Sequence, residues 1–218
     1  MEFVQGVDFV TFTSNSAYHD FENAIQVLVK MIVKEFKDCN VEDFPAEKWK
    51  QKVESVFEDS HRKHSLDLGV MNEISQFLTA ELPEKISIGT CHGDLTFSNV
   101  IVKKEGEVCI FDFLDPPIET PYEDAAKFLQ DAKFFWSLNK YTGKCDKTRV
   151  KIYWERASQI LLAQIEEHCD IETLRKFQIL GLARIIPYTS DKKIVRYLLN
   201  CMIREVRCAA NSALRLLS

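Results

Sequence analysis

The spacing of hydrophobic residues changes from a helical to a strand-like pattern in the middle of the chain. This change constrains the fold more than any other feature. Residues 100–102 and 108–111 are short runs rich in β-branched and aromatic side chains. Residues 103–107 lie between them and contain Gly106, which tolerates a positive φ. Two such runs around a short glycine-containing loop predict a β-hairpin. We expect this hairpin to be the only sheet of a mainly helical α+β protein.

Most of the chain outside the hairpin has helical periodicity. Residues 1–13 are the exception, because apolar and polar side chains alternate there and predict an extended piece. After them, apolar residues recur every three or four positions. The predicted helices begin at about Ala17 and at Pro45, and others cover about 70–82, 122–138, 147–168, 171–186 and 192–217, with a loop at residues 38–44.

Composition excludes several classes of protein. Hydrophobic residues make up 46 % of the 218 residues, enough for a core and too many for a disordered chain. The net charge of −5 disfavours non-specific nucleic-acid binding. The 7 cysteines are odd in number and lack C-x-x-C spacing, which is typical of a reducing compartment. With no apolar run of membrane-span length and no signal peptide, we expect a cytoplasmic protein without nucleic-acid or membrane partners.

Polar residues with a defined spacing flank the two hairpin strands. His92, Asp94 and Asn99 come just before the first strand, and Asp112 comes just after the second. Phosphoryl transfer needs a carboxylate that orients the attacking hydroxyl, and oxygen ligands that hold Mg²⁺ on the phosphates. An antiparallel hairpin returns its second strand to the start of the first, so these side chains should converge. The sequence therefore predicts a phosphotransferase site.

These motifs resemble those of the aminoglycoside phosphotransferase and choline kinase family, which are kinase-fold enzymes that phosphorylate small molecules. The family's catalytic loop has the form H-G-D-x-x-x-x-N, and its metal-binding aspartate follows a hairpin. Three segments carry the resemblance in the expected order: CHGDLTFSNVIV, VCIFDFLD and PYEDAAKFL.

The resemblance implies a role for each matching residue. Asp94 would be the catalytic base, and His92 would brace its loop. Asn99 and Asp112 would bind Mg²⁺, with Asn99 also in the ATP site, and Asp124 would be structural. The implied reaction is ATP-dependent transfer of the γ-phosphate to a hydroxyl of a small molecule, such as a sugar, an amino alcohol or an aminoglycoside.

Departures from the protein-kinase pattern favour a small-molecule kinase. Gly93 stands where protein kinases carry Arg. Asp112 is followed by Phe113 and Leu114, so the glycine of D-F-G is missing, and there is no A-P-E motif.

The first six residues resemble the hinge that joins the two lobes of this family, which has the form M-E-[YF]-[VI]-x-G. By that resemblance Glu2, Phe3 and Val4 would contact the adenine. No glycine-rich loop and no V-A-I-K-like strand precedes His92. We therefore expect residues 1–218 to be a kinase-like C-terminal lobe whose N-terminal lobe is absent through truncation, gene splitting or loss. Its expected parts are a hinge-like segment (1–13), inserted helices (14–84), the catalytic loop with its metal-binding hairpin (85–120) and a helical subdomain (121–218).

Other interpretations stay open at this point. The chain could be a catalytically impaired remnant that acts as a binding or interaction module, and apolar surface at the position of the missing lobe could be covered by a homodimer or by a separate N-lobe chain. A binuclear metallophosphatase also uses G-D-x motifs, but His168 is the only later histidine that could serve it. Four aromatic residues could line an acceptor pocket or, as is more common, pack in the core: Phe134, Phe135, Trp136 and Trp154.

Overall fold

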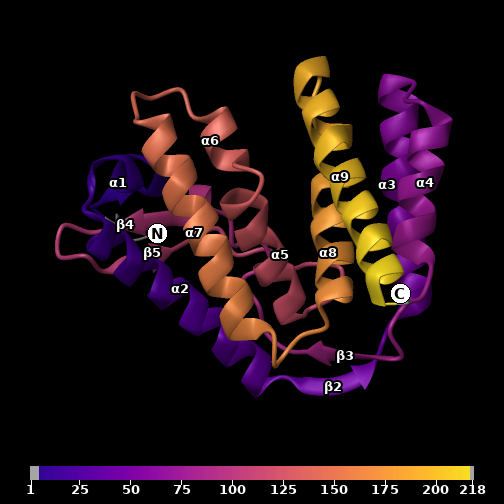
Figure 1. Cartoon of the computed structure of the whole chain (residues 1–218), viewed down its shortest axis with the longest axis horizontal. Coiled ribbons are helices and arrows are strands. Elements are labelled where there is room, and N and C mark those ends of the chain that lie inside the picture. The colour runs from indigo at the N-terminus through magenta and orange to yellow at the C-terminus, as the bar shows by residue number, and fades with distance from the viewer. Residues whose placement is uncertain (1–4, 217–218) are drawn as a thin grey trace. The chain divides into compact units, whose positions relative to one another are not determined.

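The computed structural model describes residues 5–216, with side chains up to residue 209, as a mainly helical α+β protein with small antiparallel sheets (Figure 1). This confirms the predicted mainly helical α+β class, but the expectation that the hairpin is the only sheet is wrong, because a second sheet is present. The chain divides into two compact units. Unit 1 contains residues up to 41 and 87–170, and unit 2 contains residues 42–86 and those from 171 onward.

Unit 1 is built from helices around a three-stranded sheet. Its helices are α1 (Phe9–Asn15), α2 (Tyr18–Asp38), α5 (Pro121–Ala132), α6 (Trp136–Lys140) and α7 (Lys147–Ile165). Its sheet has the order β1-β4-β5, with β1 (Val7–Asp8), β4 (Val100–Val102) and β5 (Val108–Ile110). The predicted hairpin is confirmed, since β4 and β5 pair antiparallel with Val100 opposite Ile110 and Gly106 has a φ of +85°.

The prediction of an extended piece over residues 1–13 is wrong for its second half. Strand β1 is only two residues long, and helix α1 begins at Phe9. Asp8 caps this helix, because its carboxylate accepts from the Thr11 backbone N–H at 2.8 Å. Phe9 is fully buried, so the tertiary core overrides the local alternation.

Two other local predictions also need correction. Residues 38–44 are not all loop, because β2 (Asn40–Asp43) forms a second, two-stranded sheet with β3 (Lys85–Ile88). The helix predicted over 122–138 is interrupted: α5 ends at Ala132, Phe135 has a φ of +55°, and α6 begins at Trp136. The second sheet depends on β3, which lies outside the local stretch of sequence and is not contained in a local pattern.

An aromatic cluster in unit 1 connects the core to the segment between β3 and β4. Phe97 lies in the short 3-10 helix Phe97–Asn99 and is buried. Its ring centroid is 4.7 Å from that of Phe9, 4.8 Å from that of Trp154 and 5.0 Å from that of Phe128. These rings come from α1, α7 and α5, so three helices hold this segment. Trp154 and Phe134 are buried, as expected for core residues.

In its described part, unit 2 is a group of four α-helices. They are α3 (Ala46–His64), α4 (Leu68–Thr79), α8 (Ile171–Ala183) and α9 (Lys192–Leu216). Trp49 of α3 packs on Phe177 of α8 with ring centroids 4.7 Å apart. The ammonium of Lys176 caps the C-terminal end of α4. It donates hydrogen bonds to the carbonyl oxygens of Phe77, at 3.1 Å, and Ala80. No helix in the described part of the chain is long and apolar enough to cross a membrane.

Candidate active site

The loop of residues 92–99 in unit 1 is closed by a contact between its ends. The side-chain Nδ2 of Asn99 donates to the Asp94 backbone oxygen at 2.8 Å and to the Asp94 carboxylate oxygen Oδ2 at 3.0 Å. Since both partners are acceptors, Nδ2 must face Asp94, and the amide oxygen Oδ1 remains available to a ligand. The two residues predicted to act as base and as metal ligand are therefore in direct contact.

Asp124, near the start of α5, anchors the first part of the loop. Its two carboxylate oxygens accept from the backbone N–H groups of His92 at 2.6 Å and Gly93 at 2.8 Å. Asp124 is fully buried. Burial raises the pKa of its carboxyl, while the hydrogen bonds from the two amides oppose this shift. The side chain thus satisfies two buried donors, consistent with the structural role that the motif implies.

Two further residues of α5 contact the same loop, and the sequence motifs did not identify them. Lys127 forms an ion pair with Asp94, with 2.9 Å between Nζ and Oδ1. Asp131 accepts from the Phe97 backbone N–H at 2.6 Å. Burial raises the pKa of the Asp131 carboxyl to about 6. Residues 124, 127 and 131 are three and four positions apart, so one face of α5 holds the loop at three points.

His92 connects the loop to the end of the hairpin. Its Nδ1 accepts from the Asp94 backbone N–H at 3.2 Å, so the ring hydrogen lies on Nε2, which donates to the Phe111 carbonyl oxygen at 2.9 Å. Backbone groups therefore occupy both ring nitrogens, and the His92 side chain is buried away from solvent. This geometry fits the bracing role predicted for His92.

Asp112 lies beside the loop in an exposed segment. The residues on both sides of it contact the loop: the Phe111 N–H donates to the Asn99 carbonyl oxygen at 3.2 Å, and the Phe113 ring centroid lies 4.2 Å from that of His92. Asp112 itself has a φ of +65°. Among residues 5–216 its carboxylate makes no hydrogen bond or ion pair, so its oxygens are available to a ligand.

Gly93 is required where the two segments meet. It has a φ of +82°, and a Cβ at this position would lie 2.1 Å from the carbonyl oxygen of Leu114. The Leu114 N–H in turn donates to the His92 carbonyl oxygen at 2.9 Å. A side chain such as the Arg of protein kinases would therefore force the two segments apart.

The oxygen atoms left over by these contacts suit a magnesium ion. In the described part of the chain, no group of three or more His, Cys, Asp and Glu side chains could hold a metal. Mg²⁺ does not need such a group, because it usually takes one or two carboxylates and fills its shell with water and phosphate oxygens. Asp112 supplies one carboxylate, and Asn99 supplies an amide oxygen. The donor set therefore fits the predicted ion.

Glu35 of α2 adds a partly buried carboxyl beside Asp124. Burial, together with the nearby Asp124 carboxylate, raises the pKa of Glu35 to about 9. Its Oε2 atom is buried without a hydrogen-bond partner among the described residues. The raised pKa favours the protonated form of Glu35, whose carboxyl can donate a hydrogen bond to Asp124. The helical pattern of α2 gave no signal for this role.

Other predicted residues differ in where they lie. Glu2, Phe3 and Val4 lie outside the described residues. Glu119 and Glu123 could face a cationic acceptor, but the sequence favours solvated loop carboxylates at both positions. Glu119 is exposed, whereas Glu123 is buried in α5, so the prediction is wrong for Glu123. Burial of Glu123 follows from its place on a helix whose residues 121–132 are all buried.

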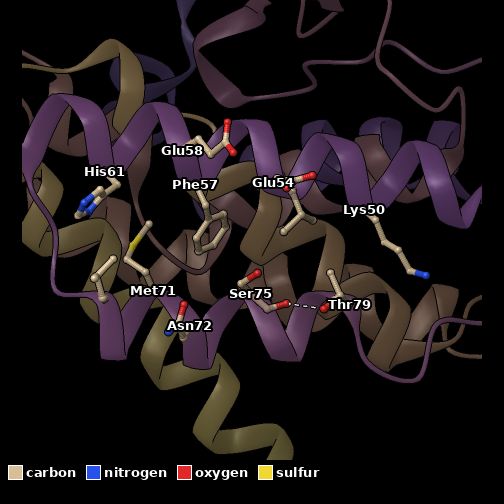
Figure 2. A pocket seen from close by; sticks show the side chains of 11 residues that line it. Lys50, Glu54, Phe57, Glu58, His61, Met71, Asn72, Ser75 and Thr79 are labelled. Atoms are coloured by element: carbon tan, nitrogen blue, oxygen red, sulfur yellow. Dashed lines mark hydrogen bonds between the residues drawn. The ribbon is translucent and has the colours of Figure 1, made fainter.

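A hollow of about 640 Å³ lies in unit 2, between α3 and α4 (Figure 2). Figure 2 shows Phe57 and Met71 pointing into the space between these helices. Glu54, Glu58 and Lys50 lie along its wall. None of the predicted catalytic or metal-binding residues lines this hollow.

The comparisons with known proteins agree with the geometry. The model of a family described as phosphotransferase enzymes matches residues 1–149, which is more than half of the chain and includes the loop, the hairpin and α5. The chain therefore belongs to this phosphotransferase enzyme family, as the sequence motifs predicted. The family generally uses ATP and Mg²⁺ and has a kinase-like fold. A comparison with curated proteins finds no match.

Proposed function

We propose that this protein transfers the γ-phosphate of ATP to a hydroxyl group of a small molecule, with the architecture of a kinase-like C-terminal lobe. The observation that carries the proposal is the position of the Asp94 carboxylate. Asn99 holds one of its oxygens at 3.0 Å and Lys127 holds the other at 2.9 Å. A carboxylate fixed in this way can orient an attacking hydroxyl and accept its proton.

The reaction assigned to the site is a single displacement. The acceptor oxygen forms a bond to the γ-phosphorus, and its proton passes to a carboxylate oxygen of Asp94. The bond between the γ-phosphorus and the bridging oxygen breaks, and its electron pair leaves with ADP. His92 and Asp124 take no part in these bond changes. They position Asp94, because they fix the backbone from which it projects.

ATP and Mg²⁺ are the cofactors of this proposal. The amide oxygen of Asn99 and the carboxylate of Asp112 would hold the ion. When bound, Mg²⁺ supplies positive charge that neutralises the phosphate oxygens. By the hinge resemblance, Glu2, Phe3 and Val4 would contact the adenine. The partner is a small molecule with a free hydroxyl, and neither a nucleic acid nor a membrane is needed.

The test is ADP release with Mg-ATP and a panel of sugars, amino alcohols and aminoglycosides. Asp94→Asn should lower turnover on any accepted compound by at least about 10²-fold, because it removes the base. Asp115→Asn is the matched control, since Asp115 is an exposed carboxylate a few residues from Asp112. It should keep wild-type turnover. Unchanged turnover in Asp94→Asn would show that the assignment of the base is wrong.

A second candidate function is that of a catalytically impaired binding module. It is favoured by apolar side chains that surround Asp112: Phe111, Phe113 and Leu114 are 41 %, 64 % and 48 % exposed. Such a surface fits a second copy of this chain or a separate chain that carries an N-terminal lobe. A thermal midpoint that does not move with millimolar Mg-ATP, together with dimerisation in sedimentation equilibrium, would favour this candidate over the enzyme.

A further inference from the structure

Lys127 is a buried cation at the centre of the candidate site. Its side chain is 11 % exposed, and that of its partner Asp94 is 23 % exposed. The structure has a second buried lysine, Lys176, whose ammonium contacts two backbone carbonyl oxygens in unit 2. Lys127 differs from it, because its ammonium pairs with a carboxylate of the predicted catalytic loop.

The donor capacity of Lys127 exceeds what Asp94 uses. An ammonium group has three N–H donors and no acceptor. The contact of 2.9 Å to Asp94 uses one of them. Because a buried charged group without further hydrogen bonds is costly, its remaining donors are suited to an oxygen ligand.

The surrounding segments supply no other cation. Residues 92–99 and 111–115 contain three aspartates and neither Lys nor Arg. Mg²⁺ held by Asp112 and Asn99 would offset part of this negative charge, but a phosphoryl group beside the Asp94 carboxylate is stabilised further by a cation on a neighbouring element. Lys127 of α5 is such a cation, because its ammonium lies beside Asp94 in the ion pair described above.

We propose that Lys127 binds the γ-phosphoryl group during transfer while it holds Asp94 in place. This inference rests on the function proposed above. In the resting site the ammonium pairs with Asp94. When phosphate is present, a second N–H donates to a phosphoryl oxygen, where negative charge collects in the transition state. Asp94 becomes neutral when it takes up the proton of the acceptor hydroxyl. The ammonium of Lys127 then interacts mainly with the negatively charged phosphoryl group.

The experiment compares how Mg-ATP and Mg-ADP raise the thermal midpoint of the full chain. In the wild type, Mg-ATP should raise the midpoint more than Mg-ADP, because the γ-phosphate adds the contact with Lys127. In Lys127→Met this difference should fall by more than half, while the shift with Mg-ADP remains. Lys127→Arg keeps the charge and should retain part of the difference. Lys103→Met is the matched control, since Lys103 forms an exposed ion pair of the same 2.9 Å length with Glu107.

The same comparison in an Asp94→Asn background separates direct contact from positioning. If Lys127 binds the phosphoryl group, Lys127→Met lowers the difference between the nucleotides by more than half in this background too. A difference that keeps more than half of its size in Lys127→Met, in either background, overturns the inference. A wild type that responds to neither nucleotide overturns the proposed function itself, and the inference falls with it.

A measurement on the wild-type chain needs no variant that might fail to fold. Amine-directed acetylation followed by mass spectrometry should show Lys127 protected by Mg-ATP more than by Mg-ADP, with Lys103 modified equally in both. Equal modification of Lys127 with the two nucleotides would also overturn the inference.

Discussion

The loop of residues 92–99 and the segment of residues 111–115 meet at one site but are built in opposite ways. In the loop every residue except Ser98 is buried or partly buried, whereas all five residues of the segment are exposed. The loop is held by three side chains of α5. Asp112, by contrast, has no side-chain partner among the described residues. The fold therefore fixes the candidate base and Asn99 in advance, and it leaves Asp112, the other candidate metal ligand, to be ordered by what binds.

The largest loss of stability is expected for Asp124→Ala, because this change removes the acceptor of two buried amides. Each unsatisfied donor costs about 1–3 kcal/mol, so loss of both should lower the free energy of unfolding by about 2–6 kcal/mol. Urea denaturation measures it. Asp115→Ala, in the exposed segment, should change the same quantity by less than about 0.5 kcal/mol. Equal losses of unfolding free energy in Asp124→Ala and Asp115→Ala would contradict the difference between the held loop and the exposed segment.

The next largest effect is expected where the loop and the segment touch. Gly93→Ala combines a positive φ with a Cβ that collides with the Leu114 carbonyl oxygen, and should cost about 2–4 kcal/mol of unfolding free energy. Gly106→Ala is the control, because Gly106 has a similar φ of +85° but no atom within 4 Å of the place that a Cβ would take. It should cost only about 1–2 kcal/mol. A Gly106 variant that is the less stable of the two would contradict this account of the contact.

A smaller, pH-dependent effect is expected for Glu35→Gln. The folded-state pKa of Glu35, about 9, lies above its ordinary value of 4.5, so the folded chain binds one more proton between these pH values. Wild-type stability should therefore fall as pH rises from about 4.5 to 9. Gln can donate to Asp124 at every pH, so the variant should match the wild type near pH 4.5 and gain a few degrees in thermal midpoint at pH 8.

The control for this comparison is Asp38→Asn, at the exposed C-terminal end of the same helix. Its stability should follow the wild-type pH dependence over the same range. If Glu35→Gln keeps the wild-type slope, then Glu35 is ionised in the folded chain and does not share a proton with Asp124.

The smallest effect on stability is expected for Asp112→Asn. Asn tolerates a positive φ nearly as well as Asp, and the exposed carboxylate has no partner to lose among the described residues, so unfolding free energy should change by less than about 0.5 kcal/mol. The variant should nevertheless lose the part of the ATP-induced thermal shift that depends on Mg²⁺. A shift that keeps its Mg²⁺ dependence would remove Asp112 from the metal site.

Short-range spacing predicted the catalytic motif because its parts lie close together in the chain. Asp94 and Asn99 are five residues apart, and a single hairpin separates Asn99 from Asp112. One local element therefore contains both the contact between Asp94 and Asn99 and the hydrogen bond from the Phe111 N–H to the Asn99 carbonyl oxygen. The structure adds the reason for Gly93, whose Cβ position is taken by a carbonyl oxygen.

Long-range contacts could not be predicted in this way. Lys127 and Asp131 follow Asp124 at helical spacing, which is a usable signal, but nothing local shows which face of α5 meets the loop. Glu35 is nearly ninety residues away from Asp124 in the sequence, and its proton depends on a burial that only the packed helices create. The break between α5 and α6 is different, because it involves a contact inside the predicted helix: Asp131 accepts hydrogen bonds from both the backbone and the hydroxyl of Ser137, which the helical period alone did not indicate.

The sequence by itself determined the family, the helical class, the hairpin and the residues of the catalytic motif, because each is encoded in a period or a spacing of a few residues. Only the tertiary structure decided how those residues are held. Buried charges such as Asp124, Asp131 and Lys127 are stable only beside specific partners, and their partners in the loop lie 31 to 34 residues away in the chain. The free energy that fixes Asp94 therefore comes from packing that no local pattern contains.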